Sequence, residues 1–368
     1  MPKPSDATRG IRRRLQKERE QAVVDEKIRL LMAEINGLKK KVVSHDMVRQ
    51  EILKLSKATI PQPTWTLQHP SLHPGSSPGV PSLFLSDWHW GEVVDKKQVN
   101  GVNEYNLEIA HRRAFNVINN ATKILRGELS RKEIPGLVLI LGGDMFSGDI
   151  HDELSRTNEQ PIMPMVLDLY GVLIEVINVL ADEYGQIFIP CVSGNHSRIT
   201  HKPFSKERSH LSFDWLLYSF LAKQFAKDSR VRFLIPEGPN ALFRIYGQTY
   251  LLNHGDEFRG GDGQVGPLGP IIRGDHKKRS KASMTGQEYD TMLIGHFHKY
   301  MPLGSQLIVN GSLVGYNEYA NAGNFGFDVP QQALWMTHPT RGITSHWPVF
   351  AEDANMAYNK SWISIMEE

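Results

Sequence analysis

Five apolar runs in this chain each end in side chains that can bind a metal ion or carry a proton. The runs are hydrophobic enough to be buried strands, and the polar residues stand where each strand is expected to end. In α/β proteins, ligands gather at the carboxyl ends of neighbouring strands. The pattern therefore predicts one shared site built from five separate stretches, LFLSDWH, LVLILGGD, IFIPCVSGNH, TYLLNHGD and TMLIGHFH.

Taken singly, each motif has a simpler explanation. Gly-Asp after a strand is a common turn, and Gly-Asn-His could be a turn with a left-handed asparagine. Asp87 and His89 are two positions apart, so on a strand they would point to the same side. The same spacing in Gly-His-x-His suggests two imidazoles sharing an ion. As an ordered set, the motifs favour a metal site over five unrelated loops.

The candidate ligands offer only imidazole, carboxylate and amide groups. The single cysteine, Cys191, excludes both an intrachain disulfide and a cysteine zinc site. Nitrogen and oxygen donors suit Mn²⁺, with Fe or Zn²⁺ as alternatives. The set is too large for one ion, and two divalent ions sharing one carboxylate would use all of Asp87, His89, Asp144, Asn195, His254, His296 and His298. Such a metal pair suits in-line displacement at phosphorus.

The segment 82–368 reads as an α/β body. Helical patterns at 106–125, 163–184 and 209–226 alternate with strand-like runs, and the later part of the chain has consecutive strands. Two β-rich runs around Gly247 predict a hairpin. This order predicts an α/β fold with mixed sheets.

Residues 1–60 differ from the rest of the chain in charge. They hold 15 Lys/Arg and 8 Asp/Glu, a net charge of +7, whereas the remaining residues sum to −5. A heptad-like apolar spacing predicts either an amphipathic helix lying on its own domain or a short coiled coil that forms a homo-oligomer. Residues 61–81 contain six prolines and no charged side chain, so we expect a linker there.

The bulk composition is that of a soluble globular protein, with 40% hydrophobic and 22% charged residues. No run of 18 apolar residues occurs, so we expect no membrane span. The first residues lack the apolar core of a secretion signal, and we expect a cytoplasmic location.

In this order, the DWH, GGD, GNH, NHGD and GHFH motifs resemble the five signature blocks of the calcineurin-like metallophosphoesterases, over roughly residues 83–312. The resemblance implies a four-layer α/β/β/α sandwich with two mixed sheets, here preceded by the helical arm. The phrases LIVNGSLVGYNEYA and PQQALWMTHP are similar to members encoded by bacteriophages and prophages. A more distant resemblance connects the chain to repair-type exonuclease subunits.

The resemblance also implies a role for each candidate residue. A first ion would be held by Asp87, His89 and His298, and a second by Asn195, His254 and His296, with Asp144 bridging the two. A hydroxide between the ions would be the nucleophile. His196 would bind no metal but would stabilise the transition state or protonate the leaving oxygen.

Two departures from the family pattern concern the surroundings of His196. Many members have an acid after Gly-Asn-His, which often orients the histidine, but Ser197 and Arg198 follow here. Asp256 is a possible substitute. Many members also have a second aspartate shortly after the bridging one, where this chain has Ser147.

Candidate substrate contacts lie outside the motifs. The stretch 273–283 reads as a basic loop, and we expect Arg273, Lys277, Lys278 and Arg279 to track a phosphate backbone, although a solvated loop is the plainer alternative. Arg156 follows the Asp144 motif closely enough to contact a phosphate. The glycine-rich stretch after His254 could be a lid. Trp88 and Trp90 would either stack on a base or pack in the core.

Three functions from different classes fit these features. The first is a metal-dependent phosphodiesterase or nuclease acting on DNA, which the basic arm and the basic loop favour. The second is a phosphatase or a small-molecule nucleotide phosphodiesterase, which the net negative body would suit. The third is a non-catalytic binding protein with the same fold, which the complete ligand set argues against.

Overall fold

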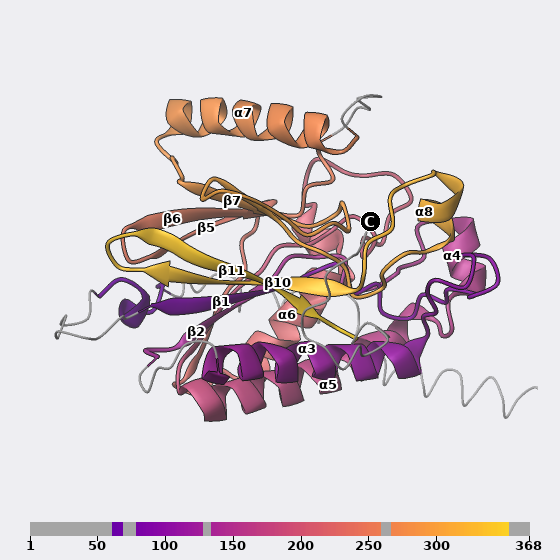
Figure 1. Cartoon of the computed structure of the whole chain (residues 1–368), viewed down its shortest axis with the longest axis horizontal. Coiled ribbons are helices and arrows are strands. Elements are labelled where there is room, and N and C mark those ends of the chain that lie inside the picture. Colours follow the sequence, from indigo (N-terminus) through magenta and orange to yellow (C-terminus); the bar gives the residue numbers. More distant parts are fainter. Residues whose placement is uncertain (1–60, 69–78, 128–133, 259–265, 353–368) are drawn as a thin grey trace, which may run out of the picture. The chain divides into compact units, whose positions relative to one another are not determined.

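The computed structural model describes residues 61–68, 79–127, 134–258 and 266–352 (Figure 1). The helical arm and coiled coil predicted within residues 1–60 lie outside the described residues. Part of the predicted linker belongs to the body, because strand β1 (Val80–Leu85) begins inside it. The short 3-10 helix η1 (Thr64–Thr66) also lies against the body, where the carbonyl of Thr66 accepts a hydrogen bond from the backbone N–H of Tyr246 at 2.6 Å.

The first sheet has six strands in the order β11-β10-β1-β2-β3-β4. Strands β1, β2 (Leu137–Leu141), β3 (Ile187–Pro190) and β4 (Val231–Leu234) run parallel. β10 (Gln331–His338) pairs antiparallel with β1, and β11 (Gly342–Phe350) pairs antiparallel with β10. The sheet is therefore mixed, as expected.

The second sheet has five strands in the order β5-β6-β7-β9-β8. β5 (Asn240–Ile245) and β6 (Gln248–Asn253) form the hairpin predicted around Gly247. β6, β7 (Thr291–Ile294) and β9 (Leu307–Val309) run parallel, and β8 (Met301–Leu303) pairs antiparallel with β9. This sheet is also mixed.

Alternation along the strands builds two cores. In β1, Leu83 and Leu85 join the core under the helices, whereas Val80 and Phe84 join the core between the two sheets. The helix-side core is covered by α3 (Leu107–Gly127), α5 (Ile162–Tyr184) and α6 (Phe213–Gln224). A third apolar cluster packs α7 (Leu268–Thr285) onto the outer face of the second sheet. The expected four-layer α/β/β/α sandwich is confirmed (Figure 1).

The stretch 273–283, predicted as a basic loop, is instead the central part of α7. Its few buried positions, Pro270, Ile271 and Gly274, gave too weak an apolar period to indicate a helix. The helix ends at Gly286, whose φ of +67° lies in the left-handed region that glycine favours at a helix C-terminus. Ile271 attaches the helix to the second sheet, because its fully buried side chain packs in the third cluster.

Within the described part of the chain, α5 alone is long and apolar enough to cross a membrane by length and composition. Buried core helices pass the same test. One face of α5 does pack against the first sheet, through residues such as Leu169, Leu173 and Ile177.

Candidate metal centre

The candidate ligands follow the strands in tight loops rather than lying on the strands. We had expected the Asp87–His89 pair and the His296–His298 pair to converge because alternate residues of a strand point to the same side. This expectation was wrong, because β1 ends at Leu85 and β7 ends at Ile294, before either pair. Both pairs lie instead in left-handed backbone conformations, with φ of +55° and +47° in the first pair and +67° and +53° in the second. Asp144 has the same conformation, at +49°.

Left-handed backbone is unfavourable for residues with a Cβ and persists only where the surrounding structure imposes it. Here the loops after β1 and β2 are tied together by backbone hydrogen bonds. The N–H of Asp87 donates to the carbonyl of Gly143 at 3.0 Å, and the N–H of His89 donates to the carbonyl of Asp144 at 3.1 Å. Such strain gathers at functional sites, and here it coincides with the predicted ligands.

Glycine is required where the loops after β2 and β3 meet. A Cβ on Gly194 would lie 2.1 Å from an oxygen of the Asp144 carboxylate, and a Cβ on Gly143 would lie 2.3 Å from the backbone nitrogen of Gly194. The two glycines therefore let Asp144 and Asn195 approach each other. This explains physically why Gly-Asp and Gly-Asn recur at these strand ends.

Asp87, His89 and His298 form the first cluster able to hold a metal, with one candidate donor atom from each within 4.8 Å of the others. The Nε2 atoms of His89 and His298 are 3.1 Å apart, and an oxygen of Asp87 lies 3.4 Å from Nε2 of His298. Asp87 and His89 are buried, and His298 is half-buried. The structure thus brings together the three residues assigned to the first ion.

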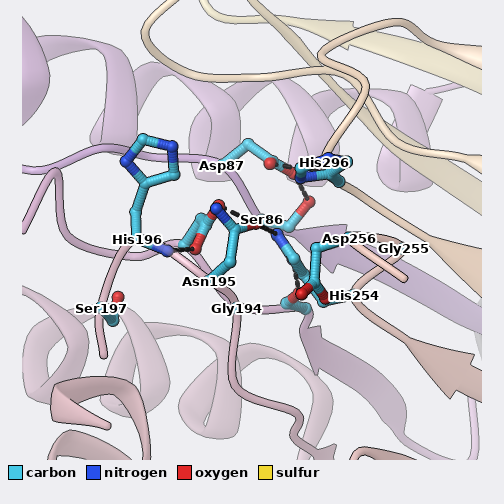
Figure 2. Close-up of polar contacts among 12 residues, drawn as sticks. Ser86, Asp87, Gly194, Asn195, His196, Ser197, His254, Gly255, Asp256 and His296 are labelled. Carbon is cyan, nitrogen blue, oxygen red and sulfur yellow. Dashed lines mark hydrogen bonds and ion pairs between the residues drawn. The ribbon is translucent and has the colours of Figure 1, made fainter. Parts of the chain in front are cut away.

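Asp144, His254 and His296 form a second such cluster. The Nε2 atom of His254 lies 2.9 Å from Asp144 Oδ2 and 3.2 Å from Asn195 Oδ1. Figure 2 shows Asn195, His254, His296 and Asp87 pointing toward one another from separate loops. All four residues assigned to the second ion, including the bridging Asp144, therefore meet.

The donor chemistry of the second cluster fits a cation. The Nδ1 atom of His254 lies 2.9 Å from the carbonyl of Gly142, so it carries the proton and Nε2 presents a lone pair. That lone pair faces the oxygens of Asp144 and Asn195, which are also electron-rich. Three acceptors converging without a donor are stable only around a positive charge, either a proton or a metal ion.

The raised pKa values of His254 and His89 also indicate that these clusters favour a positive charge. Burial lowers the pKa of His254, but the adjacent carboxylate of Asp144 outweighs burial and raises it to about 10. Burial likewise lowers the pKa of His89, but the hydrogen bond and charge of Glu92 raise it to about 8. A divalent ion at each cluster would supply this charge in place of the protons.

His196 lies beside both clusters. Its backbone N–H donates to Asp144 Oδ1 at 2.6 Å, and its Nδ1 lies 3.2 Å from the carbonyl of Ser147. Its ring is 4.6 Å from that of His89 and 5.7 Å from that of His151. His196 also forms a third possible metal group with His89 and Asp144. Burial lowers the pKa of His196 to about 4, so its imidazole is neutral near pH 7.

Asp256 does not orient His196. Its carboxylate pairs with Arg208, which sequence reasoning missed. The carbonyl of Ser147 is the group that holds the His196 ring. Ser147 stands where many family members carry a second aspartate, and its backbone performs the contact. No sequence pattern could have indicated this, because any residue type offers the same carbonyl.

Asp214, in the first turn of α6, was missed and is central to the site. Its fully buried carboxylate accepts hydrogen bonds from the backbone N–H groups of Asp144, Met145 and Gly194 at 2.9–3.2 Å. It also accepts one from the Ser197 hydroxyl at 2.6 Å. Burial raises the pKa of Asp214 to about 6. One carboxylate thus ties together the loops that carry Asp144 and Asn195.

Glu92 was also missed. Its carboxylate, only 6% exposed, lies 3.2 Å from Nδ1 of His89 and accepts a 2.8 Å hydrogen bond from the amide of Asn317. A carboxylate on the second nitrogen of a metal-binding histidine fixes the ring and its tautomer. The signal in the sequence was its position three residues after His89, just past the end of the first motif.

The candidate substrate contacts divide into two groups. Arg156 on α4 (Asp152–Thr157), Arg273 and Lys277 are exposed to solvent. Lys278 is held by Glu257 at 2.8 Å and by Asn240 at 2.9 Å. Arg279 binds Asp275 and three backbone carbonyls, those of Tyr289, Asp290 and Gln306, so it anchors α7 to the second sheet.

Neither Trp88 nor Trp90 can stack on a base, because both side chains are fully buried. The indole N–H of Trp90 donates to Asp168 at 2.8 Å, and that of Trp88 donates to Gln332 at 3.2 Å. Their role is core packing. Half of the glycine-rich stretch predicted as a possible lid, residues 259–265, lies outside the described residues, and its last three residues begin α7.

Comparison with family models and with curated proteins finds no match. Solved structures that are similar include a predicted phosphoesterase from Streptococcus pneumoniae, at 9% identity and a TM-score of 0.27, covering 74% of this chain and 99% of that one. Vacuolar protein sorting 29 from Cryptosporidium parvum matches at 11% identity and a TM-score of 0.29, covering 73% and 98%. A sulfate thiohydrolase from Thermus thermophilus matches at 10% and 0.31, covering 77% and 58%.

The chain itself combines an α/β/β/α sandwich with clustered residues that could hold metal ions. The sandwich, the order of the five motifs along the chain and the meeting of their side chains are all observed in the described residues. These features are the ones that the resemblance to the calcineurin-like metallophosphoesterases implies.

Proposed function

We propose that this protein is a two-metal phosphoester hydrolase that cleaves phosphate diesters, with DNA as its favoured substrate. The observation that carries the proposal is the position of Asp144. Its carboxylate belongs to the cluster with His254 and His296, and it also lies within 4.8 Å of a ring nitrogen of His89, a residue of the first cluster. A carboxylate shared in this way is what two adjacent divalent ions require.

Divalent ions bound there would neutralise phosphoryl oxygens and activate water, with Mn²⁺ the best match to the donors. Asp87, His89 and His298 would hold one ion, and Asn195, His254 and His296 the other, with Asp144 between them. Glu92 would keep Nε2 of His89 directed at the ion by binding its Nδ1 atom.

His196 would act on the substrate. Its Nδ1 is engaged by the carbonyl of Ser147, so Nε2 is the atom left to meet a phosphate. Burial keeps the pKa of His196 at about 4. A phosphate beside the ring would add negative charge and favour protonation of Nε2. That proton could then pass to the leaving oxygen.

The preference for a polymer rests on charge. Arg273 and Lys277 are exposed on α7, four residues apart and so on one face of the helix, and residues 1–60 carry a net charge of +7. A small nucleotide or phosphomonoester is the second candidate, because the chain beyond residue 60 has a net charge of −5.

A side-by-side assay tests the proposal. The full-length protein is supplied with Mn²⁺ and given linear duplex DNA, single-stranded DNA, bis-p-nitrophenyl phosphate and p-nitrophenyl phosphate. We expect cleavage of the diesters, with DNA preferred. Hydrolysis of the monoester alone would eliminate the diesterase proposal, and hydrolysis of bis-p-nitrophenyl phosphate without DNA would confine it to small diesters.

A further inference from the structure

Three exposed aromatic rings lie on the segment between β9 and β10. Tyr319 is 77% exposed, Phe325 51% and Phe327 52%. Tyr319 and Phe325 contact each other with ring centroids 5.8 Å apart, and Phe327 lies 5.7 Å from Tyr316. We call Tyr319, Phe325 and Phe327 the aromatic platform. Clustered apolar surface of this kind marks binding sites more often than chance exposure does.

The helix that carries Tyr319 is held by polar contacts. Tyr319 lies on α8 (Glu318–Ala322), which has no buried residue. Glu318 accepts a hydrogen bond from the backbone N–H of Asp95 at 2.8 Å, and the Asn321 amide donates to the carbonyl of Gln98 at 2.9 Å. These bonds fix the helix while leaving the aromatic faces to solvent, so the rings are positioned before any ligand arrives.

The platform is connected to the first metal cluster by one short chain of contacts. Asn317 caps α8 by accepting from the N–H of Ala320 at 3.0 Å, and its amide donates to Glu92 at 2.8 Å. Glu92 in turn contacts Nδ1 of His89 at 3.2 Å. The segment therefore begins two side chains away from a candidate metal ligand.

The segment also borders the strand end that carries His298. The ammonium group of Lys299 lies 3.0 Å from where a Cβ on Gly326 would stand, between the two phenylalanines of the platform. The backbone N–H of Tyr300 donates to Asp328 at 3.3 Å. A cation beside a segment with exposed rings, next in sequence to the candidate metal ligand His298, is complementary to a nucleotide, which presents a flat base and an anionic phosphate.

We infer that the aromatic platform binds an unpaired nucleobase adjacent to the phosphate held at the metal centre, with Lys299 contacting the backbone. This inference rests on the proposed function and narrows its substrate to single-stranded or locally unpaired nucleic acid. Stacking on exposed rings accepts any base, so the platform gives affinity without reading sequence.

The test uses two single-stranded oligonucleotides of equal length, one normal and one with abasic tetrahydrofuran sites in place of its central nucleotides. Binding is measured by fluorescence anisotropy in Ca²⁺, and cleavage of the same pair in Mn²⁺. The variant is the double substitution Tyr319→Ala and Phe325→Ala in the full-length protein. Met284→Ala, at an 85% exposed residue on α7, is the control for loss of exposed apolar surface.

The wild-type protein should bind the normal strand about tenfold more tightly than the abasic strand, since each stacked base contributes on that order. The double variant should lose this difference and bind the abasic strand as the wild type does. The Met284→Ala control should behave as the wild type. Because both substituted side chains are exposed, the variant should keep the wild-type melting temperature.

Two results would overturn the inference. One is equal binding of both strands by the wild-type protein. The other is an equal loss on both strands in the double variant. If the wild-type protein instead self-associates through these rings, so that its mass in light scattering falls in the double variant, the platform is a protein-docking surface. Binding that distinguishes the strands without any cleavage would refute the proposed diesterase activity and leave the platform standing.

Discussion

The carboxylate of Asp214 accepts a 2.6 Å hydrogen bond from the hydroxyl of Ser197, the residue that stands where many metallophosphoesterases have an acid. Asp214 thus places a carboxylate next to Ser197 from another part of the chain, but this carboxylate has a different role. It holds the backbone of the Asp144 and Gly194 loops rather than the His196 ring. The site is therefore organised from α6, a helix that carries no motif.

Replacing Asp214 by Asn should destabilise the protein and weaken metal binding. The side-chain amide of asparagine has one acceptor oxygen and cannot accept from four donors at once. Each buried donor left without a hydrogen bond costs about 1–3 kcal/mol. We expect a loss of about 2–3 kcal/mol in urea unfolding of the metal-free protein. The partly exposed ion pair of Asp228 with Arg230 at the surface provides the control, and Asp228→Asn should cost less than about 1 kcal/mol. Equal losses in both variants would contradict the role of Asp214.

Replacing Glu92 by Gln should lower affinity for one of the two ions. The amide keeps the shape of the side chain but removes the negative charge beside Nδ1 of His89. Loss of such a partner typically lowers metal affinity by about 10–100-fold. Calorimetric titration with Mn²⁺ should show one weakened and one unchanged site. As a control, Glu104→Gln at an exposed position should leave the affinity of both metal sites unchanged. If Glu92→Gln binds Mn²⁺ as tightly as this control, Glu92 does not support a metal ligand.

Replacing His196 by Ala should reduce kcat on a diester by about 10²–10⁴-fold, the usual contribution of a positioned acid or base. Metal content should stay close to two ions per chain, because His196 is assigned to the substrate. His276→Ala, which removes an exposed imidazole from α7, is the matched control and should keep full activity. Loss of an ion from the His196→Ala protein would make His196 a ligand of the third cluster.

Metal affinity should rise with pH across the neutral range. In the metal-free protein the pKa of His254 is raised to about 10 and that of His89 to about 8, so both carry protons at pH 7. An ion must displace these protons, so metal affinity rises about tenfold per unit increase in pH for each proton displaced, as long as the pH is below the pKa of that histidine. The pKa of His296 is lowered to about 4 by burial, so that residue releases none. Mn²⁺ titrations at pH 6.5, 7.5 and 8.5 check this, and a flat profile would contradict it.

The ligand residues could be predicted from the sequence because metal chemistry restricts both residue type and motif order. The way they converge could not. Strand alternation predicted that His296 and His298 share a strand face, whereas the chain reaches the same result through left-handed turns after β7. Those turns depend on contacts between loops, which a local pattern does not contain.

The supporting residues were harder still. Asp214 lies 70 positions beyond Asp144, and nothing in its own neighbourhood marks it as a partner of that loop. The helical state of 273–283 was hidden for a similar reason, because the packing of Ile271 against the second sheet decides it, and the local apolar period is weak. Burial also decided between the two alternatives for Trp88 and Trp90, which are core residues and do not stack on a base.

The most direct test of the metal centre is anomalous diffraction at the manganese edge from crystals of the full-length protein saturated with Mn²⁺. The account predicts two peaks about 3.5–4 Å apart with the carboxylate of Asp144 between them. A single peak, or no peak within reach of His89 and His254, would contradict it.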